Sequence, residues 1–110
     1  MKTEIIEIKE NKKLKITGDI DMHTSPELRE ILLSLIKNSR NQCVCVDFSD
    51  VTYIDSSGIA TFVEGLKAIR TSGSRLFFYG LPENIMEIFR FSRLDRVFEI
   101  YRTFEDAFGI

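Results

Sequence analysis

A chain of 110 residues has the size of one ordinary domain and is too short for two. Its formal net charge of −2 argues against a dedicated nucleic-acid binder, because phosphate binding normally needs a basic surface. A hydrophobic fraction of 44% suits a soluble protein with a single core. We find neither an apolar run long enough to cross a bilayer nor the apolar block of a signal peptide, so we expect a cytoplasmic protein without a membrane partner.

The first predicted elements are two short strands, at residues 4–9 and 13–17, in which apolar and polar residues alternate. The polar segment Glu10-Asn11-Lys12 separates them, so the pair should form a β-hairpin. We expect Gly18 to end the second strand and residues 19–23 to form a loop.

A helix is predicted next, because several start signals lie together. Thr24 or Ser25 can act as the N-cap, Pro26 lies in the first turn, and Glu27 follows Thr24 by three residues. The apolar residues of this helix recur at the spacing of one helical face and should form a buried stripe: Leu28, Ile31, Leu32, Leu35 and Ile36.

The segment 42–48 shows no polar alternation before Asp47, which is typical of an interior strand covered on both faces. Residues 49–54 then lead the chain to Asp55. The remaining predicted elements are a helix from about Ser57 to Ser72, a strand at 75–79, a helix opened by Pro82, a short strand near 97–100 and a last helix capped by Thr103.

Two cysteines, Cys43 and Cys45, lie in the segment 42–48 and should point to the same face of a strand. This spacing is poor geometry for a mutual disulfide. A metal site is equally unfavourable, because His23 is the sole histidine and there is no second cysteine pair. We therefore expect buried, reduced core cysteines and no metal.

After the first hairpin, strands and helices alternate along the chain. This order implies right-handed crossovers and a mixed, mostly parallel sheet. We find no internal repeat, linker or low-complexity segment. The sequence therefore predicts a single α/β domain over residues 1–110, with about five strands flanked by about four helices.

Two predicted loops are candidates for a functional site. Function in open α/β sheets collects at the carboxyl ends of strands, where residues 18–23 and 52–58 should lie side by side. Ser56 and Ser57 sit where a helix begins, so a phosphate there would meet free backbone N–H groups and the positive end of the helix dipole. Gly58 has no side chain, so another molecule's backbone could approach it closely.

An ordinary structural explanation stands beside this functional one. Asp55-Ser56-Ser57 before an apolar helix is also the pattern of simple N-capping, and Gly58 could merely permit tight packing against a neighbouring strand. Asp21 and His23 could likewise be loop residues before a capped helix. Taken alone, these residues leave both explanations open.

An enzyme is the least favoured interpretation. Ser56, His23 and Asp21 supply the three residue types of a hydrolytic triad. The nucleophile-elbow pattern fails, because residue 54 is isoleucine where that pattern has glycine. Asp21 and His23 are also only two residues apart on a loop, a poor arrangement for orienting one imidazole. Without a glycine-rich nucleotide motif either, we expect no catalytic residue and no cofactor.

Two longer motifs occur together in this chain. Gly18-Asp19-Ile20-Asp21-x-x-Thr24 follows the second strand, and Val46-Asp47-Phe48-x-x-Val51-x-x-Ile54-Asp55-Ser56-Ser57-Gly58 spans a strand and the loop after it. Together with Gly73-Ser74-Arg75-Leu76, they resemble the anti-sigma factor antagonists of the STAS family, typified by sporulation and stress-response antagonists of bacteria. The resemblance covers nearly the whole chain and implies a STAS domain over residues 1–110.

The resemblance implies that Ser56, the serine directly after the aspartate, is the phosphoacceptor. The kinase would be the anti-sigma factor itself, a GHKL-type serine kinase that binds the ATP and Mg²⁺. The unphosphorylated antagonist would bind this kinase and release the sigma factor. Phosphorylation would abolish that binding, and a metal-dependent serine phosphatase would restore it.

The implied partner-binding surface takes residues from both loops: Asp21, Met22, His23, Thr24, Asp55, Ser56, Ser57 and Gly58. Met22-His23 lies in a variable stretch of the motif, so the choice of partner stays open. The alternative is a STAS interaction module in another complex, such as a stressosome scaffold or a lipid-transport subunit. The intact Asp55-Ser56-Ser57-Gly58 favours the stand-alone antagonist.

Overall fold

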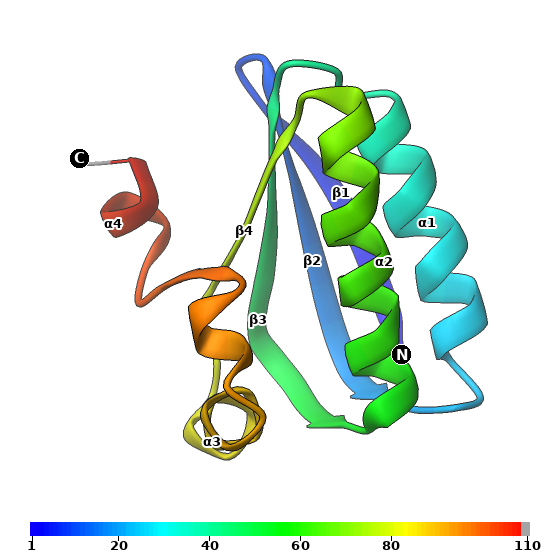
Figure 1. Cartoon of the computed structure of the whole chain (residues 1–110), viewed down its shortest axis with the longest axis vertical. Helices are drawn as coiled ribbons and strands as arrows, with labels where there is room; N and C mark the ends of the chain where they lie inside the picture. The colour runs from blue at the N-terminus through cyan, green and yellow to red at the C-terminus, as the bar shows by residue number, and fades with distance from the viewer. Residues whose placement is uncertain (109–110) are drawn as a thin grey trace.

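The computed structural model describes residues 1–108, whose strands form one five-stranded sheet in the order β1-β2-β3-β4-β5 (Figure 1). The predicted hairpin is confirmed: β1 (Lys2–Ile8) and β2 (Asn11–Ile20) pair antiparallel. At the turn between them, Lys9 adopts a left-handed conformation with φ of 58°.

The other three strands join the sheet in parallel, each beside the strand that precedes it in the sequence. They are β3 (Cys43–Ile54), β4 (Arg75–Tyr79) and β5 (Glu99–Tyr101). The predicted mixed, mostly parallel sheet is therefore confirmed. The helices within residues 1–108 are α1 (Ser25–Lys37), α2 (Ser56–Ser72), α3 (Glu83–Phe91), α4 (Phe104–Phe108) and a single 3₁₀ turn, Leu94–Arg96.

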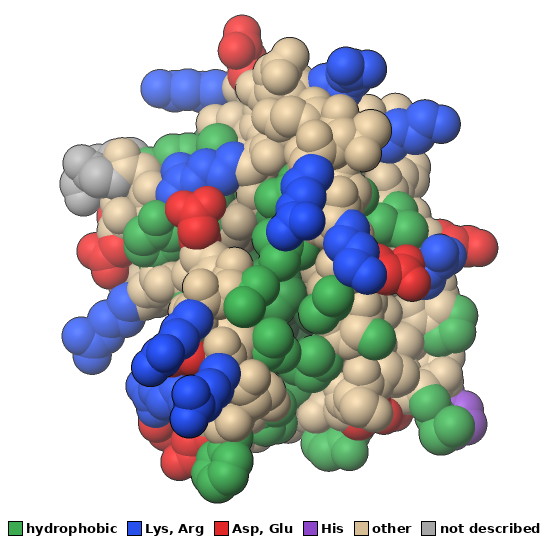
Figure 2. All heavy atoms as spheres, in the orientation of Figure 1, with side chains coloured by type: hydrophobic (Ala, Val, Ile, Leu, Met, Phe, Trp, Pro, Cys, Tyr) green, Lys and Arg blue, Asp and Glu red, His purple; other side chains and the backbone are tan. Residues whose placement is uncertain are grey.

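Helices α1, α2 and α3 cover one face of the sheet, with α1 and α2 side by side (Figure 1). The main core lies between these helices and the strands. Its aromatic centre is Phe48, whose ring lies 5.2 Å from that of Phe62 on α2 and 5.0 Å from that of Phe78 on β4. Figure 2 shows further hydrophobic side chains along the seam between α2 and α3, which agrees with the half-buried Ile59, Val63 and Leu66 of α2.

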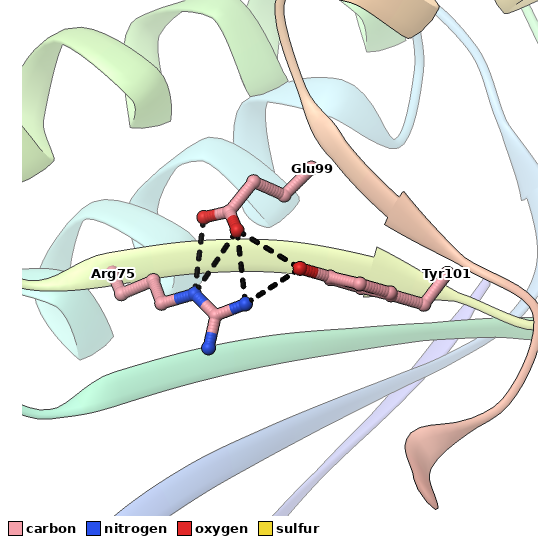
Figure 3. Close-up of polar contacts among 3 residues, drawn as sticks. All are labelled: Arg75, Glu99 and Tyr101. Atoms are coloured by element: carbon pink, nitrogen blue, oxygen red, sulfur yellow. Dashed lines mark hydrogen bonds and ion pairs between the residues drawn. The ribbon is translucent and has the colours of Figure 1, made fainter. Parts of the chain in front are cut away.

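The opposite face of the sheet carries a second, smaller apolar cluster. Cys45, Phe77 and Tyr79 are buried there beneath Ala107 of α4. On the same face Arg75 ties β4 to β5: its Nε donates to Glu99 at 3.1 Å, and its Nη2 donates to Tyr101 Oη at 2.8 Å (Figure 3). The first half of β3, residues 43–48, is thus covered on both faces, as predicted for the segment 42–48, whereas residues 49–54 include exposed side chains.

The largest errors in the predicted boundaries are the ends of β2 and β3, which were both placed too early. Gly18 does not end the second strand, and residues 49–54 are part of a strand rather than a connection. β2 bends at Gly18, where φ is 99° and the register shifts, but it then continues to Ile20. Both strands continue beyond their predicted ends because these ends pair with each other, up to Ile20 beside Ile54.

The predicted core cysteines are correct in part. Both cysteines are free, but only Cys45 is buried, and Cys43 is half-buried. Burial raises the pKa of the Cys45 thiol to about 12, which keeps it protonated at neutral pH.

Neither a membrane span nor a metal-binding cluster is found in the part of the chain that the structure describes. No helix within residues 1–108 has both the length and the apolar character to cross a bilayer. The same residues contain no group of three or more His, Cys, Asp or Glu side chains that could hold a metal ion.

Candidate functional site

The two candidate loops lie side by side, as predicted, because β2 and β3 end next to each other. Ile20 and Ile54 are paired across the two strands, and the backbone N–H of Asp55 donates to Ile20 O at 3.1 Å. A second link joins Thr52 Oγ1 to Asp19 Oδ1 at 2.5 Å. Helices α1 and α2 therefore begin beside each other at this edge of the sheet (Figure 1).

Asp55 is the N-cap of α2. Its Oδ1 accepts hydrogen bonds from Ser57 N at 2.9 Å and Gly58 N at 3.2 Å, and the Ser57 hydroxyl donates to it at 2.5 Å. The bond from the Ser57 hydroxyl is the main cause that lowers the pKa of Asp55 below its ordinary value. The carboxylate is therefore ionised at neutral pH.

This cap corrects one expectation. We expected a phosphate on the serines to meet free backbone N–H groups, but those of Ser57 and Gly58 are already bonded to Asp55. A phosphate in this loop would have to displace the carboxylate or remain in solvent beside it.

The two serines of the loop have different surroundings. Ser57 is half-buried, and its Oγ lies 2.9 Å from the Oγ of Ser25 at the start of α1. Ser25 in turn donates to Asp21 O at 2.6 Å, so these hydroxyls connect both loops. Ser56 is exposed, and no hydrogen bond of its hydroxyl is found within residues 1–108. The accessible hydroxyl of the loop is that of Ser56.

Gly58 is needed for packing. An added Cβ would lie 2.7 Å from Ile20 Cγ2 and 2.7 Å from Ile54 Cγ1, closer than real Cβ atoms come. The structural explanation is therefore correct for Gly58, and the expected approach of another molecule's backbone is wrong, because this chain's own isoleucines fill the space. Gly58 lets α2 start directly above the ends of β2 and β3.

The first loop is held rigidly by Asp21. Its Oδ1 accepts from the backbone N–H groups of His23 at 2.9 Å and Thr24 at 3.1 Å. Thr24 precedes α1 but forms no side-chain cap bond; instead its Oγ1 donates to Asp19 O at 3.0 Å. Thr24 is therefore the N-cap residue of α1, as predicted, but its side chain does not cap the helix, since that hydroxyl is used inside the loop.

Exposed side chains and a shallow groove lie at the starts of α1 and α2, next to Ser57 and its neighbour Ser56. Met22 is 69% exposed, and His23 is exposed as well. The groove, of about 310 Å³, separates the first turns of α1 and α2 and is lined by Met22, Ser25, Pro26, Arg29, Ser57, Ala60, Thr61 and Glu64. This is a surface on which a protein partner could dock.

Asp21, His23 and Ser56 are not linked as a hydrolytic triad would be. The Asp21 carboxylate accepts from the backbone N–H of His23, and the serine hydroxyl that donates to a carboxylate is that of Ser57, to Asp55. Ser25, whose buried hydroxyl joins the two loops, was not predicted as a site residue. Its only signal was the position before Pro26 at a helix start, which it shares with many ordinary capping residues.

Comparisons with known proteins agree with this fold. The family model of the STAS domain matches residues 2–107. The anti-sigma-B factor antagonist of Bacillus subtilis (strain 168) is 30% identical over 98 residues, which cover 86% of this chain and 88% of that protein. The anti-sigma-B factor antagonist of Staphylococcus epidermidis is 34% identical over 77 residues, which cover 70% of each chain.

Solved structures with the same fold have lower sequence identity. A crystal structure of an anti-sigma factor antagonist from Mycobacterium paratuberculosis matches with a TM-score of 0.84 and 20% identity, over 98% of this chain and 91% of that one. The Bacillus cell fate determinant SpoIIAA in its phosphorylated form matches with a TM-score of 0.71 and 17% identity, over 98% of this chain and 97% of that one.

Proposed function

Because this chain belongs to the STAS domain family, we propose that it is an anti-sigma factor antagonist whose binding is switched off by phosphorylation of Ser56. One observation carries this proposal: Ser56 presents an exposed, unengaged hydroxyl at the start of α2, whereas Ser57 is held by Asp55 and Ser25. A kinase needs a hydroxyl that it can reach.

The proposed partner is an anti-sigma factor that is also a serine kinase of the GHKL type. On this proposal the ATP and Mg²⁺ belong to the kinase, and this chain is its substrate. The unphosphorylated form binds the anti-sigma factor in the cytoplasm and releases the sigma factor. A metal-dependent serine phosphatase resets the switch.

The proposed contact surface is formed by the side chains that surround Ser56. Met22 and His23 project from the first loop, and the groove between α1 and α2 lies beside them. Asp21, Thr24 and Asp55 hold the two loops in place by their hydrogen bonds. A partner that covers this surface also covers Ser56.

Electrostatics explains how one phosphate can abolish binding. Phosphorylation adds about −1.5 to −2 charge and three acceptor oxygens. That charge would lie beside the ionised Asp55, and the backbone N–H groups of Ser57 and Gly58 are already taken by Asp55. The phosphate would therefore stay solvated on the contact surface. A desolvation and repulsion penalty of about 3–4 kcal/mol weakens binding several hundredfold.

Phosphorylation with a defined kinase tests the proposal. The protein is incubated with ATP, Mg²⁺ and the GHKL-type kinase encoded nearest to its gene, and products are read by intact mass and phosphopeptide mapping. We expect a single phosphate on Ser56, none on Ser56→Ala, and normal phosphorylation of Ser57→Ala. A phosphate found only on Ser57 would show that the assignment is wrong.

A further inference from the structure

β1 is an edge strand whose outer side pairs with no other strand within residues 1–108. Such an edge presents unpaired backbone N–H and C=O groups to any strand that approaches. Proteins usually block long edges with a proline, a bulge or charged side chains, above all lysine. Between Thr3 and Ile8 there is no proline, bulge or lysine, and the pairing with β2 is unbroken. The charged residues there are Glu4 and Glu7, and Glu7 is paired with Lys12 of β2.

A groove of about 480 Å³ runs beside this edge, between β1 and α1. Its apolar lining comes from Ile5, Ile31 and Leu35. Ile5 is 51% exposed, which is unusual for an isoleucine in the middle of a strand. The polar lining comes from Glu30, Ser34 and Asn38 of α1.

The dimensions of the groove fit an extended chain. From Glu30 to Asn38, α1 rises about 12 Å, which equals three to four residues of a strand at about 3.4 Å each. Alternate side chains of a strand face the same way. A strand added to β1 would therefore place one side chain between Ile31 and Leu35, and the next on that face beside Glu30.

The charge of Glu30 indicates which side chain of the added strand would lie beside it. Its carboxylate forms no ion pair within the described residues, so a cation fits there. The relative direction of β1 and α1 follows from the topology. Lys2, at the start of β1, pairs with Thr17 near the end of β2, and the chain continues from that end into α1. β1 and α1 thus begin at the same end of the molecule (Figure 1). An antiparallel strand would reach the apolar part of the groove first and Glu30 two residues later.

We propose that β1 and the groove beside it bind an extended segment of a partner protein, in which an aliphatic residue is followed two positions later by lysine or arginine. The backbone of the segment pairs with β1, and its two side chains occupy the groove. A second copy of this chain fits less well, because in its own β1 the residue two positions after Ile5 is Glu7, a like charge for Glu30. This binding does not depend on phosphorylation of Ser56.

A synthetic peptide provides the test. The probe has seven residues, the length of β1, with valine in the middle, lysine two positions later and threonine elsewhere. We expect saturable binding by fluorescence anisotropy, together with protection of β1 amide protons from exchange. A control peptide with N-methyl groups on alternate peptide bonds has the same side chains but cannot pair, and we expect it to bind at least about tenfold more weakly.

A charge exchange tests the predicted contact with Glu30. Glu30→Lys should weaken binding of the lysine peptide about fivefold and favour a peptide with glutamate at that position. Glu87→Lys makes the same change at an exposed site on α3, and it should alter neither the affinity for the lysine peptide nor the charge preference.

Three outcomes would overturn the proposal: no binding of the lysine peptide, equal binding of the N-methylated peptide, or an unchanged charge preference in Glu30→Lys. A dimer in sedimentation experiments that the peptide cannot dissociate would also overturn it, since the edge would then belong to a second copy.

Discussion

Ser56 and Ser57 are neighbours at the start of α2, yet their hydroxyl groups have different surroundings. The hydroxyl of Ser57 is bonded to Asp55 and lies against Ser25, whereas Ser56 faces solvent. This difference follows from the N-cap geometry, in which the cap carboxylate reaches the second and third residues of the helix and leaves the first outside. The accessible serine is therefore set by helix capping.

Removal of the Ser57 hydroxyl should raise the pKa of Asp55. That hydroxyl is the largest cause of the lowered pKa, so in Ser57→Ala the value should move up toward the ordinary 3.8. Titration of the Asp55 carboxyl carbon by NMR measures this directly. Ser56→Ala is the matched control and should leave the pKa of Asp55 where it is; an identical pKa in Ser57→Ala would contradict the assigned cap.

The same carboxylate should make stability depend on pH in acid. Because the pKa of Asp55 is lower in the folded state than in the unfolded chain, its contribution is present above the ordinary value of 3.8 and is lost as pH falls through the folded value. Asp55→Asn cannot titrate, so its melting temperature should depend less steeply on pH in that range. Equal slopes for the two proteins would exclude this contribution.

Gly58 and Gly65, both buried in α2, should respond differently to alanine. At Gly58 the new methyl group meets Ile20 and Ile54 at 2.7 Å, so we expect a loss of about 1–3 kcal/mol in the free energy of unfolding. At Gly65 the nearest atom, 2.9 Å away, is the flexible end of Leu32, and alanine also favours the helix. Gly65→Ala should therefore cost much less in urea denaturation. A larger cost at Gly65 would contradict this account.

Among the secondary-structure elements, the periodic ones were predictable and the ends of the long strands were not. The hairpin and the helices α1 and α2 follow from apolar spacing and capping signals. β2 and β3 were predicted too short because Gly18 and the polar Ser49-Asp50 look like strand ends. Their extended ends form because each supplies hydrogen-bond partners to the other, and such mutual pairing leaves no pattern in either segment alone.

The site was predictable in its position but not in its hydrogen bonds. Parallel strands bring their carboxyl ends to one edge of the sheet, so the two loops could be placed side by side from the sequence. Which groups occupy the N–H groups of α2, and that Ser25 reaches Ser57, depend on how the two helix starts pack together. Spacing along the chain carries no information about that packing.

The attachment of β5 to the sheet gives a test at the scale of elements. Arg75 forms an ion pair with Glu99 (Figure 3). Its guanidinium also lies over the Phe77 ring, 4.9 Å from the ring centre. Because the ion pair is partly exposed, Glu99→Ala should cost about 0.5 kcal/mol of unfolding free energy. Arg75→Ala also removes the stacking and should cost about 1 kcal/mol. Equal losses in urea denaturation would show that the stacking contributes nothing.

For the whole molecule, the proposed switch requires a change of surface charge and not a change of fold. The loops around Ser56 are held by hydrogen bonds from Asp21, Asp55 and Thr52, and α2 is fixed to the core by Phe62. Phosphorylation of Ser56 should therefore shift backbone amide resonances mainly in residues 18–25 and 52–60. Large shifts throughout the sheet would indicate a conformational switch instead.

The most direct test of the central claim is the affinity of the anti-sigma factor for this protein before and after phosphorylation of Ser56, measured by isothermal titration calorimetry with a non-hydrolysable ATP analogue. We expect tight binding of the unmodified protein and of Ser56→Ala, and several-hundredfold weaker binding of the phosphorylated form. Ser56→Asp should also bind weakly. Equal affinity of the unmodified and phosphorylated proteins would contradict the claim that a phosphate on Ser56 blocks the contact surface.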